Sequence, residues 1–318
     1  MILDFPSSPL SRKLAEKYGY DEFIVRRWIN FFGDEAVEII EAMEKVPKYI
    51  RINTLKIEEN ELIERLEKRG FILEKTEVDY CYKVLKEAYS IGATPEYLMG
   101  YYYVMDKSSC IPPLALEPEK TDVVIDFASS PGGKTTFIAQ LMENKGVILA
   151  IEVQKERIPA LKDNIHRMGV MNTVIVNADS TKIHSAGIKA DRILLDAPCT
   201  GEGIIHKDPT RKHSRGEKDI AFCSGLQFSL LISAIKTLRR GGVLVYSTCS
   251  MTPEENEIVV SKVLDYFDGR VELRLETIPY GDKALIMDGV RDELKNARRL
   301  YPHKHQCSGF FVAKIRKL

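Results

Sequence analysis

From about residue 115 onward, the sequence alternates between short apolar segments typical of strands and amphipathic segments typical of helices. We expect strands at Thr121–Phe127, Val147–Glu152, Val174–Asn177, Arg192–Ala197 and Val243–Ser247, and helices near 134–142, 154–168, 219–239 and 253–267, followed by strands near 270–277 and 310–315. This alternation predicts an α/β fold with a doubly wound, mostly parallel sheet. Ligands of such sheets bind beyond the carboxyl ends of the strands.

The first part of the chain has a different rhythm. It predicts helices within 9–45, a strand at 49–55, a helix at about 58–69, and strands near 71–76 and 80–85. A length of 318 residues suits two domains. We therefore expect a smaller N-terminal α+β domain over 1–115 and a sheet domain over 116–318.

Composition excludes several classes of protein. Lys plus Arg and Asp plus Glu both number 46, which excludes a histone-like polycation. Any contact with nucleic acid therefore requires local clusters of basic residues. The six cysteines show no CxxC pair, which argues against a zinc site or a disulfide scaffold. The start lacks the apolar core of a signal peptide, and no apolar run approaches the roughly 18 residues of a membrane span. We expect a monomeric cytoplasmic protein without a metal.

The loop after the first strand of the sheet domain reads DFASSPGGKT over residues 126–135. Gly132 and Gly133 allow close approach of a ligand to the backbone, and the following helix start offers free amides. The end of this loop resembles a P-loop, with Asp196 as a Walker B acid. The P-loop spacing requires glycine at position 128, where this chain has Ala128.

A nucleoside cofactor across the sheet is the second interpretation of this loop. Glu152 ends the second strand, where an acid can bind both ribose hydroxyls, and Asp179 follows the third. S-adenosylmethionine fits better than NAD, because the GxGxxG motif is absent. Alternatively, both acids only cap the structures that follow them.

Two cysteines follow neighbouring strands of the predicted sheet. Cys199 stands in Asp-Ala-Pro-Cys after the fourth strand, and Cys249 in Ser-Thr-Cys-Ser after the fifth. If these strands are adjacent, both thiols point into one crevice beside the cofactor. A lone cysteine is more often a small buried apolar residue, but these two lie in polar turns.

The motifs DFASSPGGKT, DAPCTGEG (196–203) and YSTCSMTPEENE (246–257) resemble those of the RNA 5-methylcytosine methyltransferases, the Fmu/Sun and NSUN-like family. The resemblance extends through RINTLK (51–56), DKSS (106–109) and RRLYP…SGFF (298–311), and the length and ending are closest to archaeal members acting on tRNA. Three residues depart from the family pattern: Ala128 replaces a cysteine, Met105 a glutamine and Ser308 an aspartate.

The resemblance implies a Rossmann-like class I methyltransferase sheet and an S-adenosylmethionine-dependent RNA cytosine-5 methyltransferase. It implies that Cys249 attacks carbon 6 of cytosine, that Cys199 assists release of the adduct, and that Asp196 contacts the base. The residues expected to bind the cofactor are Ala128, Ser129, Ser130, Pro131, Gly132, Gly133, Lys134, Glu152, Arg157, Asp179 and Asp196. Lys134 is expected opposite the methionine carboxylate and Arg157 beside Glu152.

RNA, with tRNA as the first substrate, is the partner that this resemblance implies. Basic residues cluster over 204–218, directly after Cys199, and the last thirty residues hold eight Lys or Arg against two acids. Such clusters can neutralise phosphates, although a solvated charge run is the commoner meaning. Tyr101, Tyr102 and Tyr103 could stack on bases or form a core strand. The alternatives are the same reaction on rRNA, a catalytically silent RNA-binding protein, or a P-loop NTPase.

Overall fold

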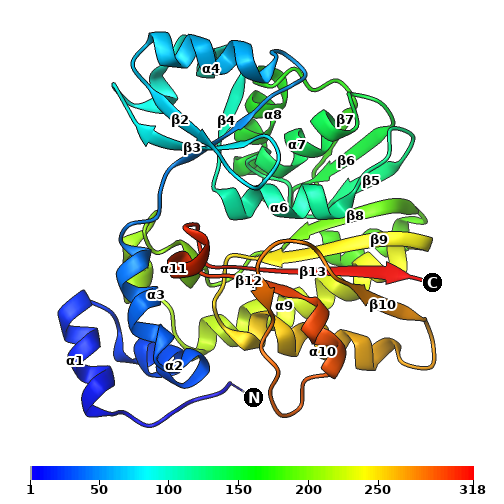
Figure 1. Ribbon diagram of the computed structural model, residues 1–318. Coiled ribbons are helices and arrows are strands. Elements are labelled where there is room, and N and C mark those ends of the chain that lie inside the picture. Colours follow the sequence, from blue (N-terminus) through cyan, green and yellow to red (C-terminus); the bar gives the residue numbers. More distant parts are fainter. Residues whose placement is uncertain (1) are drawn as a thin grey trace.

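The computed structural model describes residues 2–318 and contains one large and one small sheet (Figure 1). The large sheet has the strand order β11-β12-β13-β9-β8-β5-β6-β7, with β10 paired to β13. Its strands are β5 (Val123–Asp126), β6 (Val147–Ile151), β7 (Thr173–Val176), β8 (Ala190–Asp196), β9 (Leu238–Thr248), β10 (Leu273–Glu276), β11 (Asp282–Lys283), β12 (Arg298–Leu300) and β13 (Phe310–Lys317). Strands β9, β8, β5, β6 and β7 are parallel and β13 is antiparallel to β9. The predicted fold class is confirmed.

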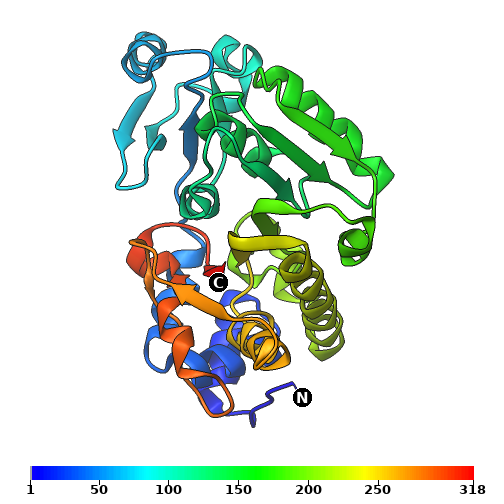
Figure 2. The same ribbon diagram turned by 90° about the vertical axis from the view of Figure 1, so that its right-hand side faces the viewer.

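Each face of this sheet packs against its own set of helices, as a doubly wound fold requires (Figure 2). The helices are α6 (Lys107–Leu116), α7 (Gly133–Leu141) and α8 (Ile158–Arg167) on one face, and α9 (Glu217–Thr237) and α10 (Glu257–Phe267) on the other. Successive strand residues alternate between the two cores: Leu194 faces the first and Leu195 the second. This alternation follows from the two-residue period of a strand.

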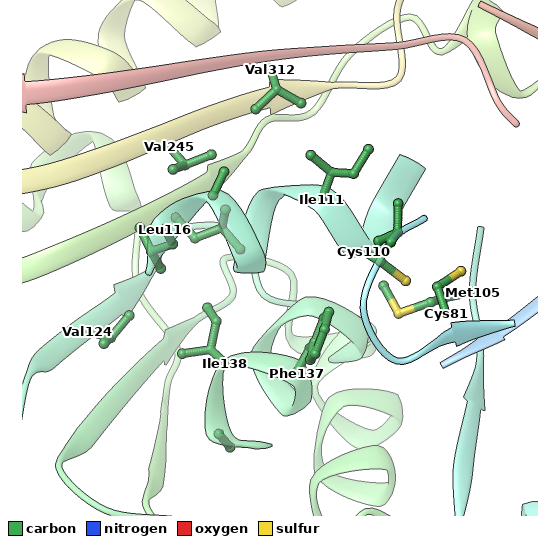
Figure 3. Packing of buried hydrophobic residues seen from close by; sticks show 14 of the residues in the cluster. Cys81, Met105, Cys110, Ile111, Leu116, Val124, Phe137, Ile138, Val245 and Val312 are labelled. Atoms are coloured by element: carbon green, nitrogen blue, oxygen red, sulfur yellow. The ribbon is translucent and has the colours of Figure 1, made fainter. Parts of the chain in front are cut away.

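Helix α6 was not predicted, because Pro112 and Pro113 suggested the end of a structural unit. Both prolines lie inside α6 and are buried. Figure 3 shows Ile111 and Leu116 of this helix between the sheet residues Val245 and Val312 and the α7 residues Phe137 and Ile138. The division that we predict at residue 115 falls at the end of α6 and stays a prediction.

Helix α9 is long and apolar enough, by length and composition, to cross a membrane. Its buried residues, such as Leu231, Ala234 and Ile235, belong to the core on one face of the large sheet. This is the environment of a core helix in a folded domain.

The N-terminal region forms two separate cores, where the sequence predicted one unit. Helices α1 (Pro9–Tyr18), α2 (Glu22–Phe32) and α3 (Glu35–Met43) pack with Ile205, Met251 and Tyr301 of the sheet domain. The second core joins α4 (Glu59–Lys68) to an antiparallel sheet of order β2-β3-β1-β4. Its strands are β1 (Tyr49–Ile52), β2 (Ile72–Lys75), β3 (Cys81–Lys86) and β4 (Tyr102–Val104), and α5 (Pro95–Leu98) precedes β4. In Figure 1, the helices α1–α3 lie beside α11 (Pro302–His305) and away from this small sheet.

Candidate active site

The two motif cysteines meet at the carboxyl ends of β8 and β9. These strands are parallel neighbours, with Asp196 opposite Ser247, so the loops that follow them leave the sheet side by side. The Sγ atoms of Cys199 and Cys249 lie 3.2 Å apart, and both are free thiols. The structure therefore places both thiols in one crevice, as the sequence predicted for adjacent strands.

The environment of Cys199 favours its protonated form. The adjacent Cys249 and burial raise the pKa of Cys199 well above its ordinary value, and the charges of Glu255 and Asp196 add to this. Cys199 is therefore held as a protonated thiol. A protonated group suits a part in proton transfer and release better than nucleophilic attack, which requires a thiolate.

Beside the thiols lies a group of charged residues at the ends of β5 and β8. The Asp196 carboxylate accepts hydrogen bonds from Ser247 Oγ at 2.8 Å and Lys134 Nζ at 2.7 Å. Burial opposes the charge on Lys134, but Asp196 outweighs burial, so the pKa of Lys134 is raised. Lys134 thus neutralises Asp196; the role predicted for Lys134 opposite the cofactor carboxylate stays a prediction.

Asp126 lies beneath this pair at the end of β5, and its role was not predicted. Its side chain is buried and accepts a 2.7 Å hydrogen bond from Thr135 Oγ1. Burial raises the pKa of Asp126 to about 6; the Thr135 hydrogen bond opposes this shift and the charge of Asp196 adds to it. Asp126 therefore fixes the start of α7 beneath the cofactor loop.

A cavity of about 490 Å³ opens beyond the strand ends, next to Cys199 and Cys249. The predicted cofactor residues that line it are Ala128, Ser130, Glu152, Arg157, Asp179 and Asp196. A second cavity of about 200 Å³ shares Ala128, Ser130 and Asp196 with the first and adds Ser129, Pro131, Gly133 and Lys134. Gly132 lines neither cavity; with φ of 105° it forms the turn into α7. All the predicted cofactor residues except Gly132 therefore line one or both of these neighbouring cavities.

The acids at the strand ends have structural partners as well as a position in the cavity. Glu152 accepts a hydrogen bond from Gln154 N–H, and Asp179 accepts two from Thr181. The capping interpretation therefore holds for Asp179, which caps the helical turn starting at Ser180, whereas Glu152 precedes the next helical turn without capping it; both acids also line the cavity. Arg157 Nη1 lies 3.6 Å from Glu152, and Arg157 Nη2 donates to the Ser130 carbonyl at 2.8 Å, so Arg157 lies where the sequence predicted.

The chemistry of this lining fits S-adenosylmethionine. A buried carboxylate at the second strand end suits ribose hydroxyls, and the apolar side chains Phe127 and Leu226 suit the adenine ring. Phe222 of α9 lies at the same cavity and is 72% exposed. Phe222 and Leu226 were not predicted as cavity residues, because apolar residues of α9 resemble ordinary core positions in the sequence.

The basic residues over 204–218 divide into two groups. Lys207 is exposed and lines the smaller cavity together with Asp196. Arg211 instead donates to the Thr200 carbonyl at 2.6 Å and pairs with Asp208, and Arg215 donates to the same carbonyl at 3.0 Å. These two arginines therefore support the loop of Cys199.

The basic C-terminal residues are mostly engaged within the protein. Ion pairs join Arg291 to Asp265, Arg299 to Glu257, Lys304 to Glu35, Lys314 to Glu117 and Arg316 to Glu276. The charge count alone had suggested phosphate binding, but most of the acids that pair with these residues come from elsewhere in the chain.

The three tyrosines at 101–103 also differ from one another. Tyr102 is a core residue of β4, and its hydroxyl contacts Thr94, so it cannot stack on a base. Tyr103 lines the smaller cavity, next to Gly133. Within residues 2–318, no group of His, Cys, Asp and Glu has the arrangement of a metal site.

Comparison with protein families gives two matches that together span most of the chain. Residues 113–316 match the family described as 16S rRNA methyltransferase RsmB/F. Residues 20–89 match the ferredoxin-like domain of RsmF/B-like methyltransferases.

Among curated proteins, the human 28S rRNA (cytosine(4447)-C(5))-methyltransferase is 41% identical over 323 residues, covering 97% of this chain and 39% of that protein. The tRNA (cytosine(72)-C(5))-methyltransferase of Pyrococcus horikoshii is 42% identical over 229 residues, covering 72% of this chain and 56% of that protein. The chain thus spans about half or less of the length of the first curated relatives that it matches.

Solved structures agree with these matches. A methyltransferase homolog protein from Pyrococcus horikoshii has a TM-score of 0.88 at 42% identity, covering 98% of this chain and all of the other. NSun6 from the same organism, solved with SFG, has a TM-score of 0.82 at 31% identity, covering 92% and 97% of the two chains.

Proposed function

Because this chain belongs to the RsmB/F and NSUN family of S-adenosylmethionine-dependent RNA cytosine-5 methyltransferases, we propose that it methylates carbon 5 of a cytosine in RNA. The observation that carries the proposal is the pair of free thiols 3.2 Å apart at the edge of the cofactor cavity. A catalytically silent relative would have no need to retain both thiols beside Asp196.

The reaction assigned to these residues proceeds through a covalent adduct between Cys249 and the base. Carbon 5 of cytosine is a poor nucleophile, and addition of the Cys249 thiolate to carbon 6 makes it reactive. S-adenosylmethionine supplies the methyl group. A base then removes the proton from carbon 5, and the electron pair of that C–H bond expels Cys249 from carbon 6. Cys199 assists this release, and Asp196 binds the amino group and ring nitrogen 3 of the base.

The cofactor is assigned to the two neighbouring cavities, which share Ala128, Ser130 and Asp196 in their linings. Glu152 would bind the ribose and Asp179 the adenine region, and the backbone of 128–133 would lie against the methionine end. Lys134 holds the Asp196 side chain in place through a hydrogen-bonded ion pair of 2.7 Å. The target base must leave its stack to reach the thiols, because they lie within the crevice rather than on an open surface.

We assign tRNA as the first substrate, and the region 1–115 to its recognition. The archaeal relative that carries a tRNA name is 42% identical in the part of the chain that it matches. A second candidate is rRNA, which is supported by relatives with rRNA names that match 97% of the chain. A reducing, cytoplasmic compartment is part of the proposal, since both thiols must stay unbridged to react.

Methyl transfer from labelled S-adenosylmethionine to tRNA and rRNA transcripts tests this proposal. The wild-type protein should label tRNA, Cys249→Ala should abolish labelling, and Cys199→Ala should accumulate a protein–RNA adduct. Sequencing of the product locates the 5-methylcytosine. Labelling of rRNA alone would contradict the assignment of tRNA as the substrate. Cofactor binding without any methyl transfer would favour a catalytically silent RNA-binding protein. ATP binding without S-adenosylmethionine binding would support a P-loop NTPase.

A further inference from the structure

A buried glutamate connects the loops of the two catalytic cysteines. Glu255 has no exposed surface. On the Cys199 side, its Oε2 accepts a 3.0 Å hydrogen bond from the backbone N–H of Thr200, and its Oε1 accepts one from the Thr200 hydroxyl. Thr200 directly follows Cys199, so Glu255 holds the residue next to this thiol by both its backbone and its side chain.

The same carboxylate holds the Cys249 loop. Glu255 Oε1 accepts hydrogen bonds from Ser250 Oγ at 2.9 Å and from Thr252 Oγ1 at 3.2 Å. Ser250 directly follows Cys249. A single side chain therefore contacts the residue after each catalytic cysteine.

Gln227 of α9 completes the connection on the other side of Cys199. Its Nε2 donates to the Pro198 carbonyl at 2.9 Å and to Glu255 Oε2 at 2.8 Å. Cys199 is thus flanked on both sides by residues tied to Glu255. Truncation of Glu255 would release both loops and leave several buried donors without an acceptor, which is costly.

Two buried carboxyl groups, those of Glu255 and Glu202, share one hydroxyl partner in this cluster. Ser250 Oγ lies 2.9 Å from both Glu255 and Glu202, and Glu202 is also buried. One hydroxyl has one proton and can donate to only one of the two carboxyl groups, so the second contact requires a proton on a carboxyl. Burial, followed by the charge of Glu202, raises the pKa of Glu255 to about 7.

We propose that Glu255 is a positioning residue that fixes the Cys199 and Cys249 thiols relative to each other. The proposal rests on the proposed function, in which both thiols act on the same base. Within the described residues, Glu255 forms no hydrogen bond with either thiol, and it acts through Thr200, Ser250 and Gln227. Its loss should therefore slow the chemical step without weakening cofactor binding.

The test compares Glu255→Ala, Glu255→Gln and Glu254→Gln under single-turnover conditions. Glu254 is the matched control, since it is the adjacent residue, is also buried, and pairs with Arg27 of α2 at 2.6 Å. We expect Glu255→Ala to lower the single-turnover rate of methyl transfer about 100-fold with an unchanged half-saturating concentration of S-adenosylmethionine, because small misplacements of reacting groups cost rates of this order. Glu255→Gln keeps a side chain that can hydrogen-bond Thr200 and Ser250, and should restore most of the rate. Glu254→Gln should lower the melting temperature without slowing the chemical step.

A second readout does not depend on the RNA reaction. The rates at which iodoacetamide alkylates Cys199 and Cys249, followed by mass spectrometry of their peptides, should change several-fold in Glu255→Ala and stay unchanged in Glu254→Gln. Thr200→Val and Ser250→Ala provide milder variants should Glu255→Ala fail to fold. Wild-type kinetics and alkylation in the Glu255 variants would overturn the positioning role. A wild-type protein that transfers no methyl group would overturn the proposed function, and the alkylation rates would still decide the role of Glu255.

Discussion

Arg51 of β1 donates a 3.0 Å hydrogen bond to the carbonyl of Gly133, so the N-terminal sheet holds the end of the cofactor loop. Its second nitrogen, Nη2, donates to Thr136 Oγ1 at 3.1 Å. The guanidinium is fully buried between the rings of Tyr103 and Phe137, and burial lowers the pKa of Arg51 to about 10. The RINTLK motif therefore serves the active site from another domain.

Replacing Arg51 with methionine should weaken S-adenosylmethionine binding and destabilise the protein. The variant leaves the Gly133 carbonyl without its buried donor, and hydrogen bonds to charged groups contribute about 1.5–3 kcal/mol. Calorimetric titration with the cofactor and denaturant unfolding measure the two effects. Arg65→Met is the control, because the Arg65–Glu61 pair lies on the exposed face of α4, where solvent screens ion pairs, and should change neither measurement appreciably. Cofactor affinity that stays at the wild-type value in Arg51→Met would contradict this role.

Asp126 should make the stability of the protein fall as the pH rises from about 4 to 6. Below its ordinary pKa of 3.8, the carboxyl is protonated in the folded and unfolded states alike. Between 3.8 and about 6, the unfolded chain releases the proton while the folded protein keeps it, so the free energy of unfolding decreases with pH. The shift of this pKa from 3.8 to about 6 corresponds to a loss of about 3 kcal/mol in the free energy of unfolding across this range.

Asp126→Asn removes this titration and keeps an acceptor for Thr135. The free energy of unfolding of the variant, relative to that of the wild type, should therefore increase by about 3 kcal/mol between pH 4 and pH 7. Denaturant unfolding at several pH values measures the difference between the two proteins. A difference that stays constant across this range would show that Asp126 ionises normally in the folded state.

Much of the catalytic edge could be predicted from the sequence, because strand ends and polar loops are local patterns. The sequence predicted that Cys199 and Cys249 would converge if their strands were adjacent, and β8 and β9 are adjacent. Helix α6 was missed because Pro112 and Pro113 usually interrupt helices, whereas here burial against the sheet offsets the two missing hydrogen-bond donors. The Glu255 cluster and the Arg51–Gly133 contact depend on long-range packing, which periodicity and spacing do not encode.

The buried pair of Arg299 and Glu257 should be costly to break from one side. Arg299 Nε and Nη2 each donate a 2.6 Å hydrogen bond to Glu257, and Arg299 Nη1 donates to the Met251 carbonyl in the Cys249 loop. Arg299→Met leaves a buried, unpaired carboxylate and should lower the free energy of unfolding by about 3–5 kcal/mol. The double variant Arg299→Met/Glu257→Met should lose less free energy of unfolding than this single variant, because it leaves no unpaired charge. Denaturant unfolding of both variants measures the difference. Additive losses would contradict direct coupling of the pair.

Lys207 should contribute to RNA binding through a phosphate contact. It is exposed, lines the cavity beside Asp196, and follows the Cys199 loop. Lys207→Ala should weaken RNA binding and reduce the slope of log affinity against log salt by about 1. The control is Lys236→Ala, because Lys236 is exposed at the end of α9, where the chain enters β9, away from the catalytic edge. Equal salt slopes for both variants and the wild type would exclude a phosphate contact at Lys207.

Gly203 should tolerate no side chain, because three backbone segments meet there. Its N–H donates to the Cys249 carbonyl at 2.9 Å, and its own carbonyl accepts from Gly309 N–H. A Cβ at Gly203 would lie 2.7 Å from the Cys249 carbonyl oxygen and would overlap Gly309. Gly203→Ala should therefore displace the Cys249 loop and abolish methyl transfer. Gly225→Ala is the matched control: a Cβ at this exposed position of α9 meets no atom within 4 Å, and alanine should stabilise the helix by about 0.5–1 kcal/mol. Full activity in Gly203→Ala, measured as label transferred per minute to the RNA, would show that the Cys249 loop can shift without loss of function.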